Sequence, residues 1–135
     1  MREYTLSQLE EAALQWWREL PRGAVVWLTG DLGTGKTTLV QAFTRAANAT
    51  PATSPSFALV HEYASPEGPL IHVDCYRLRR PEEALDLDLP ELGRRARLLF
   101  IEWPERAVPF VPAPDLHLKL FYGSSPDRRR IEGSR

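Results

Sequence analysis

A glycine-rich segment that follows a strand-like run constrains this chain more than any other feature. Residues 30–37 read Gly-Asp-Leu-Gly-Thr-Gly-Lys-Thr and match the phosphate-binding pattern G-x-x-x-x-G-K-[ST]. The preceding run, Ala24 to Thr29, is almost continuously apolar, which predicts a central strand buried on both faces. Leu39 and Phe43 then recur at helical spacing, in a helix expected to end near Asn48. A strand, a phosphate loop and a helix in this order indicate an α/β nucleotide-binding fold.

The phosphate-loop pattern has a physical reason at each position. Glycines let the backbone curl and approach phosphate oxygens, and the following helix presents its free N–H groups and positive dipole end to the anion. Lys36 is expected to bridge β- and γ-phosphate oxygens, and the Thr37 hydroxyl to bind Mg²⁺. The alternative is a glycine turn that precedes a helix by chance, and the flanking strand and helix disfavour it.

A carboxylate at the end of a neighbouring strand must complete the magnesium shell. Asp74 follows the apolar run Leu70–Val73, and Glu102 follows Leu98–Ile101. Because ligands of open α/β sheets bind at the carboxyl ends of strands, each acid is a candidate. The alternative for each is a solvated acid at a strand end, and the pattern alone does not rank the two.

The remaining segments predict one α/β domain over residues 1–135, with a mixed central sheet and flanking helices. Ser7 begins a capping-box pattern, which predicts a first helix over about Gln8 to Leu20. Phe57–Tyr63 and Leu70–Asp74 are expected to pair as an antiparallel hairpin. The other expected elements are a short helix at 81–85, strands at 98–102 and 116–121, and a strand at 129–132 that pairs with the preceding one.

Charge and composition exclude several classes of function. The formal net charge is -1, which removes the simplest argument for direct nucleic-acid binding. No apolar run is long enough to cross a membrane, and residues 1–4 lack the apolar core of a signal peptide, so we expect a cytoplasmic location. The guanine signature [NT]-K-x-D is missing, since the only lysines are Lys36 and Lys119. His61, His72 and His117 stand singly, without the spacing of metal ligands, and are expected at polar cross-strand positions.

Three further segments extend the pattern around the phosphate loop. Residues 53–63 contain T-S-P-S-F and V-x-E-Y, residues 72–78 read H-V-D-C-Y-R-L, and residues 102–106 read E-W-P-E-R. Together with residues 30–38, in this order, they closely resemble the TsaE family, also called YjeE. The family comprises small bacterial ATPases of tRNA threonylcarbamoyladenosine synthesis, and the resemblance covers about Thr5 to Arg106.

This resemblance implies roles for individual residues. Thr37 and Glu102 resemble the magnesium ligands, and Asp74 resembles the functional acid near the γ-phosphate. Thr5 and Glu105 resemble positions that touch the nucleotide away from the phosphates. The group expected to hold the phosphates, through Lys36 and through loop backbone, is Leu32, Gly33, Thr34, Gly35, Lys36, Thr37 and Thr38. Tyr76 and Trp103 resemble aromatic residues near the site.

The segment Thr53–Phe57 resembles a switch-like loop that senses the γ-phosphate through hydroxyl groups. The family usually has Thr where this chain has Ser56, which keeps a hydroxyl. Phosphoryl transfer also gains from a positive group on the developing charge. Arg77 could supply it, but could equally hold the switch region or a carboxylate of a partner.

The resemblance implies a cytoplasmic ATPase that uses ATP with Mg²⁺, is slow alone, and is stimulated by the TsaB and TsaD proteins. Contact with tRNA would then run through that complex, and no membrane is involved. Two alternatives stay open from the residues. A small-molecule kinase could use the same loop to pass the γ-phosphate to a hydroxyl, although 135 residues leave little room for an acceptor site and a lid. A nucleotide-gated adaptor with incidental hydrolysis is the other.

Overall fold

Strand β2 (Ala24–Thr29) forms the middle of a mixed sheet, in a computed structural model that describes residues 2–51 and 59–135. Within those residues the sheet has eight strands in the order β1-β8-β7-β2-β6-β5-β4-β3. The other strands are β1 (Arg2–Thr5), β3 (Thr50–Pro51), β4 (Val60–Ala64), β5 (Leu70–Asp74), β6 (Leu98–Glu102), β7 (Leu116–Tyr122) and β8 (Arg128–Ser134).

The four inner strands run parallel, and the outer strands run antiparallel to their neighbours. Strand β2 pairs in parallel with β6 on one side and with β7 on the other, and β5 pairs in parallel with β6. Strands β4 and β5 form the expected antiparallel hairpin, with His61 opposite His72. Residues 57 and 58, expected in its first strand, lie outside the described residues. The expected pairing of the last two strands is confirmed by the antiparallel ladder of β7 and β8.

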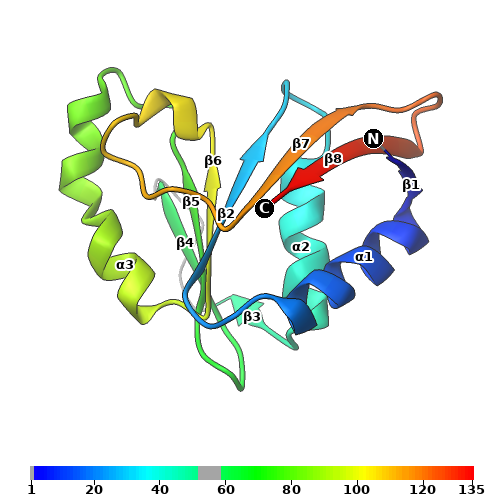
Figure 1. The fold of residues 1–135 in the computed structure, drawn as a ribbon, viewed down its shortest axis with the longest axis horizontal. Coiled ribbons are helices and arrows are strands. Elements are labelled where there is room, and N and C mark those ends of the chain that lie inside the picture. The colour runs from blue at the N-terminus through cyan, green and yellow to red at the C-terminus, as the bar shows by residue number, and fades with distance from the viewer. Residues whose placement is uncertain (1, 52–58) are drawn as a thin grey trace.

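Helices cover both faces of the sheet (Figure 1). Helices α1 (Leu6–Glu19) and α2 (Lys36–Ala46) pack on one face, and α3 (Leu89–Arg95) packs on the other. Side chains of β2 alternate between two cores, as a strand buried on both faces requires. Val26 joins the core that contains Phe43 of α2, and Val25 joins the core that contains Leu89 of α3. The fold is therefore a single α/β domain with a mixed sheet and flanking helices, as expected.

The first helix begins earlier than expected. Thr5, not Ser7, is the residue that caps it, because the Thr5 hydroxyl accepts from the Gln8 backbone N–H at 3.3 Å. The Gln8 side chain in turn accepts from the Thr5 N–H at 3.0 Å. Both pairs fit the capping-box pattern. Strand β1, which sequence reasoning missed, ends at Thr5 and pairs with β8, so the extended chain delivers Thr5 to the capping position.

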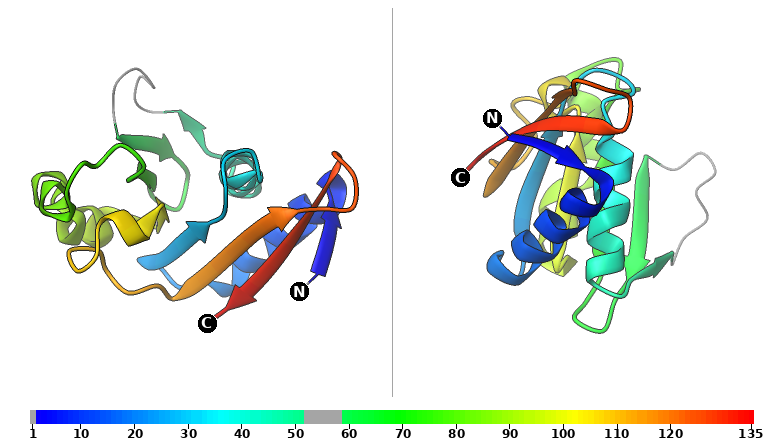
Figure 2. Two further views of the ribbon diagram at one scale, coloured as in Figure 1. Left: turned by 90° about the horizontal axis from the view of Figure 1, so that it is seen from above. Right: turned by 90° about the vertical axis from the view of Figure 1, so that its right-hand side faces the viewer.

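Other short elements also differ from expectation. The helix expected at 81–85 is the 3₁₀ segment η1 (Pro81–Leu87), and α3, β3 and the 3₁₀ segment η2 (Pro104–Arg106) were not foreseen. Asn48 does adopt a left-handed conformation after α2, with φ of 55°. Figure 2 shows β8 between β7 and β1, with α1 beneath this extension of the sheet.

Candidate functional site

The loop between β2 and α2 is shaped by two glycines. Gly35 has φ of 100°, a left-handed value that a side chain disfavours, and it caps α2. Gly30 has φ of 147°, and a Cβ there would lie 2.5 Å from the Leu120 carbonyl oxygen and 2.8 Å from the Thr34 hydroxyl. No side chain caps the start of α2, so the first N–H groups of this helix are free to face an anion.

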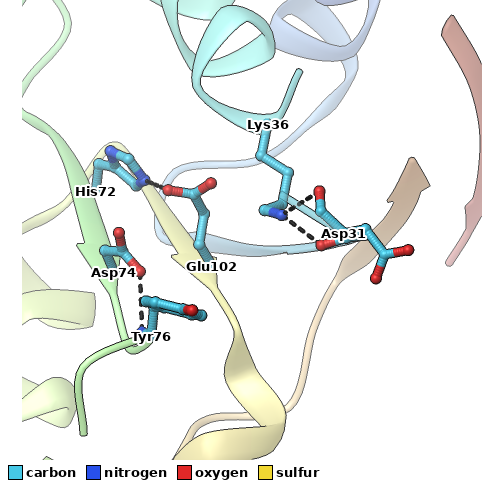
Figure 3. Close-up of polar contacts among 7 residues, drawn as sticks. Asp31, Lys36, His72, Asp74, Tyr76 and Glu102 are labelled. Carbon is cyan, nitrogen blue, oxygen red and sulfur yellow. Dashed lines mark hydrogen bonds and ion pairs between the residues drawn. The ribbon is translucent and has the colours of Figure 1, made fainter. Parts of the chain in front are cut away.

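Lys36 begins α2 and directs its ammonium back over the loop. Its Nζ donates to the carbonyl oxygens of Gly30 and Asp31, the latter at 3.1 Å, and lies 4.6 Å from the centre of the Trp103 ring (Figure 3). The residue is only 6% exposed. Burial lowers the pKa of Lys36 from its usual value, and the charge of Glu102 opposes that shift most strongly.

Asp74 and Glu102 lie side by side at the carboxyl ends of their strands. Each ends an apolar strand as expected, and the two are register partners in the parallel pair of β5 and β6, which the sequence did not predict. One oxygen of Asp74 accepts from the Tyr76 backbone N–H at 2.9 Å. Glu102 is buried, with 4% exposure, and its charge is one of those acting on Lys36. The sheet thus brings both candidate acids to the edge where the phosphate loop begins.

His72 has a role that sequence reasoning missed. It does occupy a cross-strand position opposite His61, with ring centres 5.8 Å apart. Its Nε2 also lies 2.6 Å from Oε2 of Glu102, in a buried contact between neighbouring strands (Figure 3). His72 therefore fixes one oxygen of Glu102 and leaves the other oxygen for a ligand. An alternation of apolar and polar residues in a strand carries no signal for such a pairing.

A cavity of about 320 Å³ gathers these side chains. Its lining contains most of the residues expected to hold phosphates and metal, together with both aromatic residues placed near the site by resemblance. The lining residues are Leu32, Gly33, Gly35, Lys36, Thr37, Thr38, Asp74, Tyr76, Glu102, Trp103 and Arg129. Thr34 is buried under the loop instead, where its hydroxyl donates to the Asp31 carbonyl at 2.7 Å. The lining combines the ammonium of Lys36 with two carboxylates, and we call this hollow the phosphate cavity after the loop that borders it.

A second cavity of about 280 Å³ borders the first, and it contains Thr5. Its lining is Tyr4, Thr5, Leu6, Leu9, Gly35, Thr38, Pro126, Asp127 and Arg129. Gly35, Thr38 and Arg129 line both cavities, so the two adjoin at the first turn of α2. The second cavity is mostly apolar, and its far wall comes from the turn between β7 and β8. Thr5, which the resemblance placed near a nucleotide, lines this cavity, whereas the turn was not foreseen.

Two other expected site residues lie outside both cavities. Glu105 belongs to η2 and is exposed, although its charge still acts on Lys36. Arg77 is exposed and lines neither cavity. The switch-like segment Thr53–Phe57, with Ser56, lies outside the described residues.

An aromatic and cationic stack closes one side of the phosphate cavity. The Tyr76 and Trp103 rings are 5.1 Å apart, and the Arg106 guanidinium lies 4.7 Å from the first and 5.5 Å from the second. Trp103 itself has φ of 55°, which is uncommon for a residue with a large side chain. That backbone conformation follows directly on Glu102 and turns the Trp103 ring toward Lys36.

The described residues hold no ready-made metal cage. No group of three or more His, Cys, Asp or Glu side chains within 2–51 and 59–135 could hold a metal ion. No helix in the described part of the chain has the length and apolar character needed to span a membrane.

Comparison with known proteins identifies similar chains. Residues 4–131 match the model of the family "Threonylcarbamoyl adenosine biosynthesis protein TsaE". A tRNA threonylcarbamoyladenosine biosynthesis protein TsaE from Nostoc sp. is 40% identical over 115 residues, covering 82% of this chain and 70% of that protein. The protein of the same name from Haemophilus influenzae is 32% identical over 112 residues, with the same coverage of both chains. A crystal structure of YdiB from Bacillus subtilis superposes with a TM-score of 0.74 and 25% identity, over 96% of this chain and 82% of that one.

Proposed function

Because the chain belongs to the TsaE family of threonylcarbamoyladenosine biosynthesis proteins, we propose that it binds and hydrolyses ATP in the cytoplasmic machinery that makes this tRNA modification. In this proposal it acts on, or resets, a complex of the TsaB and TsaD proteins. Its contact with tRNA runs through that complex, in keeping with a net charge of -1.

One observation carries the proposal: the phosphate loop, Lys36 and two strand-end acids converge on a single cavity. A polyphosphate in this cavity would face the free N–H groups at the start of α2 and the ammonium of Lys36. These donors favour the charge that develops on a γ-phosphoryl group during transfer. The adjoining apolar cavity offers room for the nucleoside, with Thr5 in its wall.

The residues present fit a magnesium ion bound together with ATP. Mg²⁺ is usually held by one or two carboxylates, with phosphate oxygens and water completing its shell. Thr37 and Glu102 line the same cavity, and His72 leaves one oxygen of Glu102 available. We assign these two residues as the metal ligands. When bound, the ion would neutralise charge on the phosphate oxygens.

We assign Asp74 the role of orienting the water that attacks the γ-phosphate. Its Oδ1 accepts from the Tyr76 N–H, which fixes the carboxylate and leaves a second oxygen to orient a water molecule. Asp74 lies beside Glu102 and lines the same cavity as Lys36, so a water on Asp74 would face the end of the phosphate chain. In the hydrolysis step, Lys36 thus acts on the phosphoryl group and Asp74 acts on the water that attacks it.

The isolated protein should hydrolyse ATP slowly and its partners should accelerate it. Within the described residues, Arg129 alone among the arginines lines the Lys36 cavity, and it also borders the apolar cavity on the nucleoside side. A positive group on the γ-phosphate would then come from a partner, and such a group contributes roughly 10³ to 10⁵ in rate. TsaB with TsaD is the expected source.

Steady-state phosphate release at saturating ATP tests the proposal, with and without TsaB and TsaD. We expect slow release alone, faster release with both partners, and no acceleration with the Lys36→Ala variant. A parallel assay with radiolabelled ATP and small hydroxyl compounds tests for phosphoryl transfer, the kinase alternative. A fast isolated enzyme whose rate is unchanged by partners that demonstrably bind it would refute the proposal.

A further inference from the structure

Arg129 occupies the junction between the two cavities. It lies near the start of β8 and lines the phosphate cavity, the apolar cavity and a third, open cavity beside the turn between β7 and β8. Its Nε is 3.1 Å from the position that a Cβ on Gly35 would take. The guanidinium therefore packs directly against the residue that caps α2, where the free N–H groups of that helix begin.

The Arg129 guanidinium is held in place, but among the described residues no ion pair neutralises its charge. Its Nη1 donates to the carbonyl oxygens of Pro126 at 2.7 Å and Arg128 at 2.9 Å. Within residues 2–51 and 59–135, no carboxylate lies within ion-pair distance of Arg129, and neither Nε nor Nη2 has a hydrogen-bond partner. The carboxylate of Asp127 accepts from the Ser125 hydroxyl at 2.5 Å, and the charges of Arg128 and Arg129 add to the lowering of its pKa, although no ion pair forms. A positioned cation with free donors at a cavity junction is suited to an anionic ligand.

We propose that Arg129 binds the phosphate that joins the nucleoside to the polyphosphate chain, and so fixes the nucleotide between the two cavities. This inference rests on the proposed function, since it presupposes a nucleotide in the site. The residues shared by both cavities, Gly35, Thr38 and Arg129, mark the place where such a ligand passes from one cavity to the other. The α-phosphate is the anionic group that lies there.

The position of Arg129 separates this role from that of a residue acting on the γ-phosphate. Lys36, Asp74 and Glu102 line the phosphate cavity but not the apolar one. Arg129 lines both cavities. Its contact is therefore made equally with ATP and ADP, and it contributes to affinity rather than to the chemical step.

The chain offers a matched control in the next residue. Arg130 carries the same charge on the same strand, is exposed, and lines none of the three cavities that Arg129 borders. Neighbouring residues of a strand point to opposite faces, so Arg130→Ala changes the net charge without touching the junction.

Isothermal titration of ADP and ATP, with steady-state kinetics, tests the assignment. Arg129→Ala should weaken both affinities by about 10- to 100-fold, with kcat at saturating ATP near the parent value. Arg130→Ala should leave both affinities unchanged. Arg129→Gln keeps an amide that can donate to the Pro126 carbonyl but removes the charge, and it should lose affinity like the Ala variant. Circular dichroism and thermal melting verify the fold of each variant.

Several results would overturn the assignment. A loss of kcat with unchanged ADP affinity would place Arg129 on the γ-phosphate. Full affinity in Arg129→Gln, but not in Arg129→Ala, would reduce its role to holding the turn. Equal losses in Arg129→Ala and Arg130→Ala would indicate a general charge effect. A parent protein that binds neither nucleotide would remove the proposed function as well, whereas a parent that binds and an Ala variant that binds equally would remove only this inference.

Discussion

Replacing Lys36 with Met should destroy activity without destabilising the protein. Lys36 is buried, with 6% of the residue exposed, and no carboxylate among the described residues forms an ion pair with it. Its contacts are two backbone carbonyls and the face of Trp103. Methionine keeps the apolar stem of this side chain and removes the charge.

The expected change in stability follows from the direction of the pKa of Lys36. A cation over an indole ring contributes roughly 0.5–2 kcal/mol, and hydrogen bonds from a charged donor contribute about 1.5–3 kcal/mol. Burial nevertheless lowers the pKa of Lys36, so the folded protein accommodates the charged form less well than water does. The two carbonyls that lose a donor, on Gly30 and Asp31, are not fully buried and water can reach them. We therefore expect Lys36→Met to raise the free energy of unfolding by between zero and about 2 kcal/mol at pH 7.

The expected change in rate has the opposite sign. A donor aimed at charge that develops during transfer contributes about 10² to 10³ in kcat. Lys36→Met should lower phosphate release by at least that factor, whether or not partners are present. The variant would thus be more stable and inactive, as expected when a buried charge is kept for function.

Urea unfolding at pH 7 and pH 10, with phosphate release on the same samples, measures both effects. The lowered pKa means that folded Lys36 loses its proton at a lower pH than the unfolded chain, whose lysines titrate near 10.5. The parent therefore gains stability relative to Lys36→Met as the pH rises toward 10.5, and the gap between them should shrink. A Met variant that is less stable than the parent by more than about 1 kcal/mol at pH 7 would show that the contacts outweigh burial.

Four further substitutions test the site and the core. Glu102→Gln should raise the Mg²⁺ concentration for half-maximal hydrolysis about tenfold or more, while Asp74→Asn should lower kcat at an unchanged midpoint; a magnesium titration with these outcomes exchanged would reverse their roles. Burial lowers the pKa of His117 in the folded protein, so as the pH falls the unfolded chain binds this proton at a higher pH than the folded protein does. The free energy of unfolding therefore falls as the pH drops below 6.5. His117→Gln should lose less stability between pH 7.5 and 5.5 by urea titration. Phe43→Ala, which removes a fully buried ring between Trp16 and Phe100, should cost about 3–5 kcal/mol by the same measurement.

The parallel centre of the sheet could be predicted from sequence because its signals are local. The strand at 24–29 is a continuous apolar run. The loop after it contains glycines with positive φ, a conformation that other residues rarely adopt. Asp74 and Glu102 each end an apolar run, and parallel pairing of β5 and β6 then places the two acids side by side. Most of the phosphate cavity follows from these three strand ends.

The order of the outer strands could not be predicted, because it depends on pairing between distant segments. Strand β1 has only four residues with a charged, polar sequence, and it becomes a strand through its ladder with β8 near the other end of the chain. That ladder also decides the start of α1 at Leu6, where Thr5 and Ser7 both offer a capping pattern. The contact between His72 and Glu102 has the same origin, since it crosses from β5 to β6.

The two halves of the proposed nucleotide site, one for the phosphates and one for the nucleoside, depend on different parts of the fold. The phosphate half depends on β2, β5 and β6, and each of these strands carries its own sequence signal. The apolar half needs β1 and the start of α1 on one side and the turn between β7 and β8 on the other. Arg129 reaches the junction only because β8 pairs with both β7 and β1, and in a run of three arginines no local pattern distinguishes it from its neighbours. Variants that weaken the pairing of β1 with β8 should therefore impair nucleotide affinity before they disturb the phosphate loop, which is anchored independently in the parallel core.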